Sequence, residues 1–296
     1  GGSLSEALKK HSQVFNRFFV SMVEAGEESG SLDIVLQDLS AYLEHTVKLQ
    51  RKVKAASTYP VFITGFFVTV VAGIVLFLIP KFKELFSSLG VELPMLTKVV
   101  MGISGFFVNY FYITALIGIG LGILFTTFYR TEKGRYQIES TLLVIPLFGI
   151  LMTKVILTRF FQTLSTLLKN GVDIVASLEI AGRVVNNVPV EKIINDIKIR
   201  IMEGSSLASE MNKYPIFPKM SVRMAAIGER SGKIDEMLSR VSEYFNDEVD
   251  ATVEGLSSII EPFLIIILGV VVGFFIIAMY LPVFRMAMGM LGGGSI

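Results

Sequence analysis

Three long apolar stretches interrupt a chain that otherwise mixes hydrophobic and polar positions. They cover Val61–Ile79, Val99–Tyr129 and Ile259–Leu281. The first two contain no charged residue, and the third contains one, Glu261. About 20 apolar residues are enough to cross a bilayer, and the core helices of soluble proteins rarely use runs of this length. The pattern therefore predicts three transmembrane helices.

The segments between these stretches have the spacing of short helices. Residues 159–170 place apolar side chains at helical intervals, and Asn170-Gly171 follows as a helix end. Residues 190–203 alternate isoleucines with charged residues, which is typical of an amphipathic helix with one wet face. We therefore expect an all-α membrane protein whose soluble parts are compact bundles of short helices.

Charge near the apolar stretches predicts the order and orientation of the segments. Lysine and arginine accumulate on the cytoplasmic side of membrane proteins, and here they cluster before the first stretch and after the second: Lys48, Arg51, Lys52, Lys54, Arg130, Lys133 and Arg135. We expect a partial first cytoplasmic helical domain (1–58), a transmembrane helix (59–80), a short periplasmic loop (81–98), a second transmembrane helix (99–129), a second cytoplasmic domain (130–258), a third transmembrane helix (259–282) and a short periplasmic tail (283–296).

The chain repeats itself. Gly-Glu-Glu-Ser-Gly at 26–30 resembles Gly-Glu-Arg-Ser-Gly at 228–232, an offset of 202 residues (228 − 26). The same shift aligns residues 15–82, called copy one below, with residues 217–284, called copy two, without a gap. We therefore expect 15–58 and 217–260 to form matching helix pairs.

The two copies differ in what precedes them. Residues 150–203 lie before Gly204-Ser205 of copy two, whereas Gly2-Ser3 already opens the chain, which begins with glycine rather than methionine. We expect the segment corresponding to 150–203 to be missing from copy one, together with whatever preceded it.

The repeated Gly-Glu-x-Ser-Gly motif is typical of a corner between two helices. Its first glycine can end one helix in a left-handed conformation, and its serine can cap the next helix. The glutamates lack such a local role, so they either orient the turn or contact a partner; a catalytic acid would have no base or nucleophile beside it. The partner-contact candidates are Gly26, Glu27, Ser29, Gly30, Gly228, Glu229, Ser231 and Gly232.

Prolines mark both ends of the repeated apolar stretch. Pro60 and Pro262 are expected in the first turn of their membrane helices, where a missing N–H costs nothing. Pro80 and Pro282 are expected to end the spans. These joints either connect soluble and membrane helices rigidly or act as hinges.

The helices that lead into the first and third spans differ in charge. Glu243, Asp247, Asp250 and Glu254 are spaced 4, 3 and 4 residues apart and share one helix face. Their counterparts in copy one are Ala41, His45, Lys48 and Lys52. The acidic stripe is either a solvated face or attracts the basic one, within a molecule or between protomers, and the basic stripe could also meet lipid headgroups.

Composition excludes several classes of function. The chain of 296 residues is 52% hydrophobic and only 18% charged, with a mean hydropathy of +0.63. Its net charge of +1 does not favour nucleic-acid binding. Cysteine is absent, neither histidine has metal-ligand spacing, and no phosphate-binding Gly-x-x-x-x-Gly-Lys motif occurs. We therefore expect no cofactor, no metal and no enzymatic activity.

A small membrane transporter or channel subunit is the alternative to a membrane scaffold. Ion and proton pathways normally carry charged or polar residues within the spans. The three stretches offer almost none, so the sequence favours a scaffold.

The motifs resemble the F-type inner-membrane platform proteins of type II secretion systems and type IV pili, the GspF/PilC family. The resemblance rests on both corner motifs, Tyr59-Pro60, Pro80-Lys81-Phe82, Leu93-Pro94 and Glu261-Pro262, and on the run 161–171. The ending 278–284 is closer to the pilus branch.

The resemblance implies a function that composition does not. Such proteins are bacterial inner-membrane, multi-pass assembly platforms, thought to couple a cytoplasmic ATPase to the insertion of pilins or pseudopilins into a filament. It implies further contacts with other inner-membrane assembly proteins, the lipid bilayer and further copies of the chain.

Overall fold

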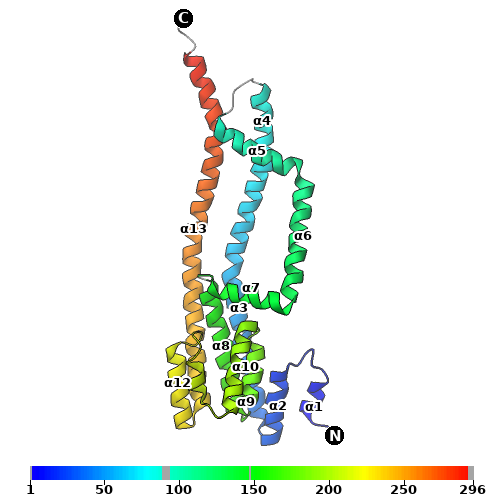
Figure 1. Cartoon of the computed structure of the whole chain (residues 1–296), viewed down its shortest axis with the longest axis vertical. Helices are drawn as coiled ribbons and strands as arrows, with labels where there is room; N and C mark the ends of the chain where they lie inside the picture. The colour runs from blue at the N-terminus through cyan, green and yellow to red at the C-terminus, as the bar shows by residue number, and fades with distance from the viewer. Residues whose placement is uncertain (1, 89–93, 147, 293–296) are drawn as a thin grey trace. The chain divides into compact units, whose positions relative to one another are not determined.

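The computed structural model describes residues 2–88, 94–146 and 148–292, without the side chains of residues 56, 57, 257, 259, 261 and 285–292. Every regular element of these residues is a helix, as the sequence predicts (Figure 1). The chain divides into two compact units: unit 1 comprises 1–55 and 129–255, and unit 2 comprises 56–128 and 256–296.

Unit 1 is built around α8 (Phe148–Lys169). The side chains of Phe160, Phe161 and Leu164 on α8 are completely buried, and Phe161 stacks on Phe245 of α13 with ring centroids 5.9 Å apart. The bundle around α8 consists of α7 (Glu132–Val144), α9 (Ile174–Val184), α10 (Val188–Met202), α11 (Leu207–Met211), α12 (Lys219–Ser231) and the first part of α13 (Ile234–Gly292). Helix α8 ends before Gly171, whose φ of 80° only glycine adopts easily.

The soluble part of copy one belongs to the same unit. It comprises α2 (Arg17–Ser29) and the first part of α3 (Leu32–Gly73), and the short helix α1 (Leu4–Lys9) precedes it. Phe18, Met22, Leu39 and neighbouring apolar residues of α2 and α3 form a second core with Leu167 of α8 and Ile180 of α9. The two soluble segments predicted from the sequence therefore share one compact unit.

Unit 2 contains the apolar helices. Three stretches of helix are long and apolar enough to cross a membrane: Leu32–Ser88, Phe111–Arg130 and Pro262–Phe284. A fourth would result if the bent pair α7–α8 formed one span, but the completely buried side chains of α8 place that helix in the core of unit 1.

The second apolar stretch is not the single helix 99–129 that its composition suggests. It divides at Tyr110 into α5 (Met95–Asn109) and α6 (Phe111–Arg130). Helix α5 lies across its neighbours in unit 2 (Figure 1), where the Thr97 hydroxyl donates to the Ala278 carbonyl of α13 at 2.5 Å. Helix α6 buries none of its residues. A second candidate span is therefore confirmed as Phe111–Arg130, and only its expected bounds were wrong, because hydropathy does not distinguish a helix that packs on helices from one that faces lipid.

The four prolines neither begin nor end their helices as expected. Pro60 lies within α3, and both Pro262 and Pro282 lie within α13. Pro80 lies in α4 (Ile79–Ser88), directly after the π-helical turn η1 (Ile74–Leu78). An internal proline removes one helical hydrogen bond and crowds the preceding turn, and a π-turn is one way a helix absorbs this disturbance.

The predicted connections after the spans are also largely helical. Within the predicted loop 81–98, α4 continues to Ser88 and α5 begins at Met95. In the predicted tail 283–296, α13 continues to Gly292. The rest of the loop, 89–93, and of the tail, 293–296, lies outside the described residues.

Candidate functional site

The repeated motif has the same local fold in both copies. Helix α2 ends at Ser29 and α12 at Ser231, and the helices that follow begin at Leu32 and Ile234. All of these boundaries are 202 residues apart. The expectation of matching helix pairs is therefore confirmed at the corner.

The second glycine of the motif, not the first, makes the turn. Gly30 has φ 68° and ψ 17°, and Gly232 has φ 70° and ψ 16°. Both conformations are left-handed, which side chains other than hydrogen disfavour. The expectation that Gly26 and Gly228 end the helix was wrong by one turn.

Gly26 and Gly228 instead let two helices approach closely. A Cβ on Gly26 would lie 2.9 Å from Cγ2 of Val35 on α3. A Cβ on Gly228 would lie 2.7 Å from the backbone Cα of Ile234 on α13. A methyl group has no room at either position, so the sharp corner itself requires these glycines.

The motif serines bond within the first helix rather than capping the second. The Ser29 hydroxyl donates to the Ala25 carbonyl at 2.7 Å, and the Ser231 hydroxyl donates to the Ile227 carbonyl at 2.9 Å. Each hydroxyl thus reaches back four residues to a carbonyl of its own helix, a bond that serine commonly forms inside helices.

The motif glutamates anchor the beginning of the preceding short helix. Glu27 accepts from the backbone N–H of Leu4 at 2.5 Å and of Ser5 at 3.1 Å. Glu229 accepts from those of Leu207 at 2.5 Å and Ala208 at 3.3 Å. These N–H groups are the unpaired donors at the start of α1 and α11, where a negative charge is favourable.

Copy one strengthens this anchor with one additional hydroxyl. The Ser5 side chain donates to Glu27 Oε2 at 2.6 Å. This bond, followed by those of the Ser5 and Leu4 amides, holds the pKa of Glu27 below its ordinary value against the opposing effect of desolvation. The corresponding position in copy two is Ala208, 203 residues further on, so the alignment gains one residue ahead of the corner.

Every motif residue therefore has a local structural role. Contact between the corner and a partner remains a prediction.

One ion pair joins the predicted charge stripes among the residues described. Lys52 Nζ lies 2.6 Å from Asp250 Oδ2, and both side chains are partly shielded. The remaining charged stripe residues are exposed: His45, Lys48, Glu243, Asp247 and Glu254. The stripes are therefore neither wholly solvated nor wholly paired. Lys52 pairs with Asp250 within the molecule, and the other charged stripe residues are exposed.

A second ion pair, which the stripe pattern did not reveal, holds the same part of α13. Lys154 of α8 lies 2.5 Å from Glu248 Oε2 and donates to the Thr252 hydroxyl at 2.9 Å. The lysine holds the pKa of Glu248 below its ordinary value through a hydrogen bond and its charge. Helix α13 is therefore held by Lys52 of copy one and by Lys154 of α8 shortly before it leaves unit 1.

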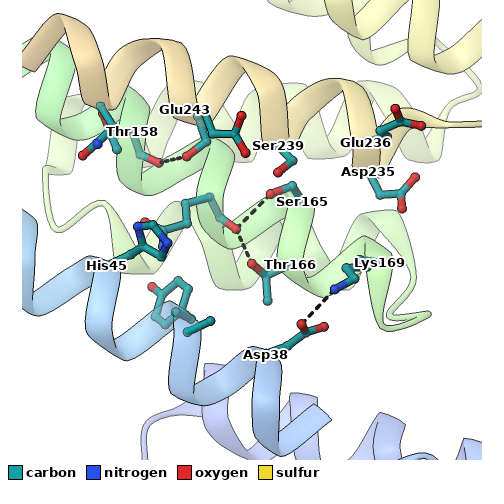
Figure 2. A pocket seen from close by; sticks show the side chains of 15 residues that line it. Asp38, His45, Thr158, Ser165, Thr166, Lys169, Asp235, Glu236, Ser239 and Glu243 are labelled. Carbon is teal, nitrogen blue, oxygen red and sulfur yellow. Dashed lines mark hydrogen bonds and ion pairs between the residues drawn. The ribbon is translucent and has the colours of Figure 1, made fainter. Parts of the chain in front are cut away.

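A polar groove of about 400 Å³ lies between α3, α8 and α13 (Figure 2). At one end of the groove, Lys169 Nζ forms an ion pair with Asp38 Oδ1 at 2.8 Å. The side-chain amide of Asn170 also donates to Asp38. His45 lines the groove from α3, and Glu243 lines it from α13. Helix α3 of copy one therefore lines one side of the groove, and α8 and α13 line the others.

The groove suits a cationic guest. Its acidic residues are Asp38, Asp235, Glu236 and Glu243. Lys169 pairs with Asp38, and Glu236 pairs with Arg240 of its own helix and with Lys233, which directly precedes that helix. Asp235 and Glu243 are the groove carboxylates for which the described residues provide no ion pair. Within the described residues, no cluster of three or more His, Asp or Glu side chains could hold a metal ion.

Sequence reasoning missed the polar wall of the groove and the partly buried cation beside it. Ser239, Ser242 and Asn246 follow helical spacing on α13 and could have been recognised as a polar stripe. Arg159 of α8 is partly buried, and burial lowers its pKa while the charge of Tyr42 opposes this effect. Only the packing of α3 on α8 brings Tyr42 and Arg159 together.

Comparison with known proteins assigns this architecture to a family. The profile of type II secretion system protein F matches residues 1–80 and 160–282. The chain belongs to the type II secretion system protein F family. Each matched segment contains one corner motif, so the family signature includes the duplication.

Relatives come from both branches of the family. The chain is 37% identical to "Type IV pilus assembly protein PilC" of Myxococcus xanthus, over 97% of this chain and 69% of the relative. It is 38% identical to the protein of the same name from Thermus thermophilus, over 96% and 70%. It is 30% identical to "Type II secretion system protein F" of Pseudomonas aeruginosa, over 96% and 70%.

Proposed function

We propose that this protein is a non-enzymatic assembly platform in the bacterial inner membrane, which couples a cytoplasmic ATPase to the insertion of pilins into a type IV pilus. The main support is the path of two helices. Helix α3 and helix α13 each start in the soluble unit and continue as apolar stretches of unit 2. A force or displacement applied to the soluble unit is thereby connected to the membrane at two equivalent points.

Sequence identity supports the pilus branch over the secretion branch. Relatives named as type IV pilus proteins reach 37% and 38% identity, whereas those named as secretion protein F reach 30% and 31%. Gene replacement in a piliated host tests this assignment. The complete gene should restore surface pili to a strain lacking its own platform protein; restored secretion without pili would overturn the pilus assignment.

The groove between the copies is the proposed contact for a basic segment of the cytoplasmic partner. A lysine or arginine bound there would contact α3, α8 and α13 together. Its binding would therefore depend on how α3 packs against α8 and α13. Ser239→Arg should abolish co-purification of the ATPase with the full protein. Asp196→Arg, at an exposed position of α10, is the matched control. Equal retention by both variants would exclude the groove as this contact.

The proposed orientation places unit 1 in the cytoplasm. The cation-rich ends of the first and second apolar stretches support it. Since the chain contains no cysteine, a single Met202→Cys variant can be labelled selectively. An impermeant maleimide should label it only after the inner membrane is opened. Labelling in intact spheroplasts would mean that unit 1 lies on the periplasmic side, opposite to the proposed orientation.

Nothing specific favours the transporter alternative. The hydroxyls of Thr69, Thr114 and Thr127 donate to carbonyls of their own helices, and those of Thr97 and Ser104 donate to carbonyls of neighbouring helices. Hydroxyls used in this way support helix packing rather than a polar path.

A further inference from the structure

The bend between α7 and α8 displays an unusual amount of apolar surface for a part of the soluble unit. We define the elbow as the described residues 140–146 and 148–153, and the sequence has no charged residue between Glu139 and Lys154. The axes of the two helices differ by 110° across it. Val144 is 82% exposed and Phe148 57% exposed. Further exposed apolar side chains of the elbow are Leu142, Ile145, Ile150 and Met152.

Hydrogen bonds and close packing fix the conformation of the elbow. Gly149 is buried, its N–H donates to the Ile145 carbonyl at 2.8 Å, and a Cβ there would overlap the carbonyl oxygen of Leu143. Glu139 ties α7 to the bundle by accepting from Arg135 Nε at 2.7 Å and from the Val188 N–H of α10 at 2.6 Å. The fold therefore fixes these apolar side chains in an outward position.

The elbow is also close in the chain to a helix suited to lipid. Helix α6 ends at Arg130 with no buried residue, and Thr131 alone separates it from α7. The 13 residues of α7 span only about 20 Å at a rise of 1.5 Å per residue. Exposed Arg130 and Lys133 lie at the start of this short path, where they could meet anionic headgroups.

Contiguous apolar surface on a soluble unit marks an interaction site, and amphipathic segments next to basic residues are suited to the membrane interface. We propose that the elbow inserts its apolar side chains into the lipid leaflet adjoining unit 1, as an anchor additional to the spans. The contact ends where α8 enters the core, because Ile156, Leu157 and Phe160 are buried. The elbow would then hold the origin of α8 at a fixed depth.

The composition of the chain provides a clean reporter, because it contains no tryptophan. The full protein carrying Phe148→Trp is reconstituted into phosphatidylcholine–phosphatidylglycerol vesicles, with and without lipids brominated on the acyl chains. Bromine quenches only a tryptophan that reaches the acyl region. Met202→Trp is the matched control, because Met202 is 67% exposed at the far end of α10.

The proposal expects blue-shifted, bromine-quenched emission from Phe148→Trp, and red-shifted, unquenched emission from Met202→Trp. Adding Val144→Glu to the Phe148→Trp protein should reduce the quenching, because a carboxylate opposes insertion. Blue-shifted emission without quenching would mean that protein, such as a second copy or another subunit, covers the elbow. Red-shifted emission without quenching would mean that the elbow faces water. Either result would overturn the proposal, and neither would affect the assignment as an assembly platform.

Discussion

The two copies share a corner but bury different faces of the helix that follows it. In copy two, Leu238, Phe245 and Val249 of α13 are 0%, 3% and 0% exposed. Their counterparts on α3, which are Leu36, Leu43 and Val47, are 48%, 42% and 40% exposed. Conversely, Tyr42 is buried and its counterpart Tyr244 is exposed. Identical local geometry is thus compatible with different packing.

The difference arises from the helix that each copy packs against. Helix α13 packs face to face with α8, through Phe161 and Phe245 among others. Helix α3 meets another side of α8, where Tyr42 shares a hydrogen bond of 3.1 Å with Thr163. Among the described residues, α3 has no counterpart of α8 on its Leu36–Val47 face. The corner is therefore a local property of the sequence, whereas the buried face depends on the neighbour.

The largest effect should come from the core position that differs between the copies. Phe245→Ala should lower the free energy of unfolding by about 3–5 kcal/mol, because it opens a cavity beside Phe161. Leu43→Ala, at the equivalent position on the exposed face of α3, should alter the free energy of unfolding by less than about 0.5 kcal/mol. Denaturant unfolding of the purified protein in detergent measures both. Similar losses would mean that Leu43 is also covered, and would remove the proposed difference.

A smaller effect should come from the shared corner. Gly228→Ala should destabilise by about 1–3 kcal/mol through overpacking, because the added methyl meets the backbone of Ile234. Gly26→Ala should cost less, because its nearest contact is the Val35 side chain at 2.9 Å and the nearest backbone atom, Cα of Leu32, is further away at 3.3 Å. Gly255→Ala, where a Cβ has open space, is the control and should not destabilise. Equal tolerance at all three positions would contradict the close approach.

Acid should loosen the anchor of copy one. The pKa of Glu27 is lowered in the folded state, chiefly by the Ser5 hydroxyl. Its stabilising effect is therefore present above the unfolded-state pKa and is lost as pH falls through the folded-state pKa. Hydrogen exchange of the Leu4 and Ser5 amides should show protection that decreases with acid in the native protein. Glu27→Gln should remove that pH dependence; an unchanged profile would exclude Glu27 as its source.

The smallest effect should come from the ion pair between the copies. Partly exposed pairs contribute about 0.2–1 kcal/mol. Asp250→Lys should therefore weaken the packing of α3 slightly, and Lys52→Glu in the same chain should restore it. The exposed stripe positions offer a control, because Asp247→Lys with Lys48→Glu should show no coupling. A double-mutant cycle measures both pairs, and equal coupling would indicate that the whole stripes attract.

Much of the architecture could be read from the order of residues alone. Apolar runs identified the membrane-type helices, and a constant offset of 202 identified the duplicated corner, because both depend on neighbouring residues in the chain. Helical spacing on α8 and α10 located two helices of the bundle in the same way. The resemblance to protein F, confirmed by the family match, rested on these local patterns.

The roles within the corner needed three dimensions. Glu27 was left without a local task because its partners, the amides of Leu4 and Ser5, lie more than twenty residues earlier. The packing of α5 likewise involves distant partners, because Thr97 and Ser104 donate to carbonyls of Ala278 and Val75. Hydropathy records how well a residue avoids water, and it is the same whether lipid or protein replaces that water.

Sequence by itself determined the all-helical class, the duplication, the apolar stretches and the family, because each follows from residue type and spacing. Tertiary structure decided which face of α3 is buried, which single rung of the charge stripes is paired, and that a polar groove lies between the copies. These features depend on distances between residues far apart in the chain, such as Lys52 and Asp250, and on the choice of α8 as common neighbour. No local pattern specifies that choice, because an apolar face can be satisfied equally well by any complementary apolar surface.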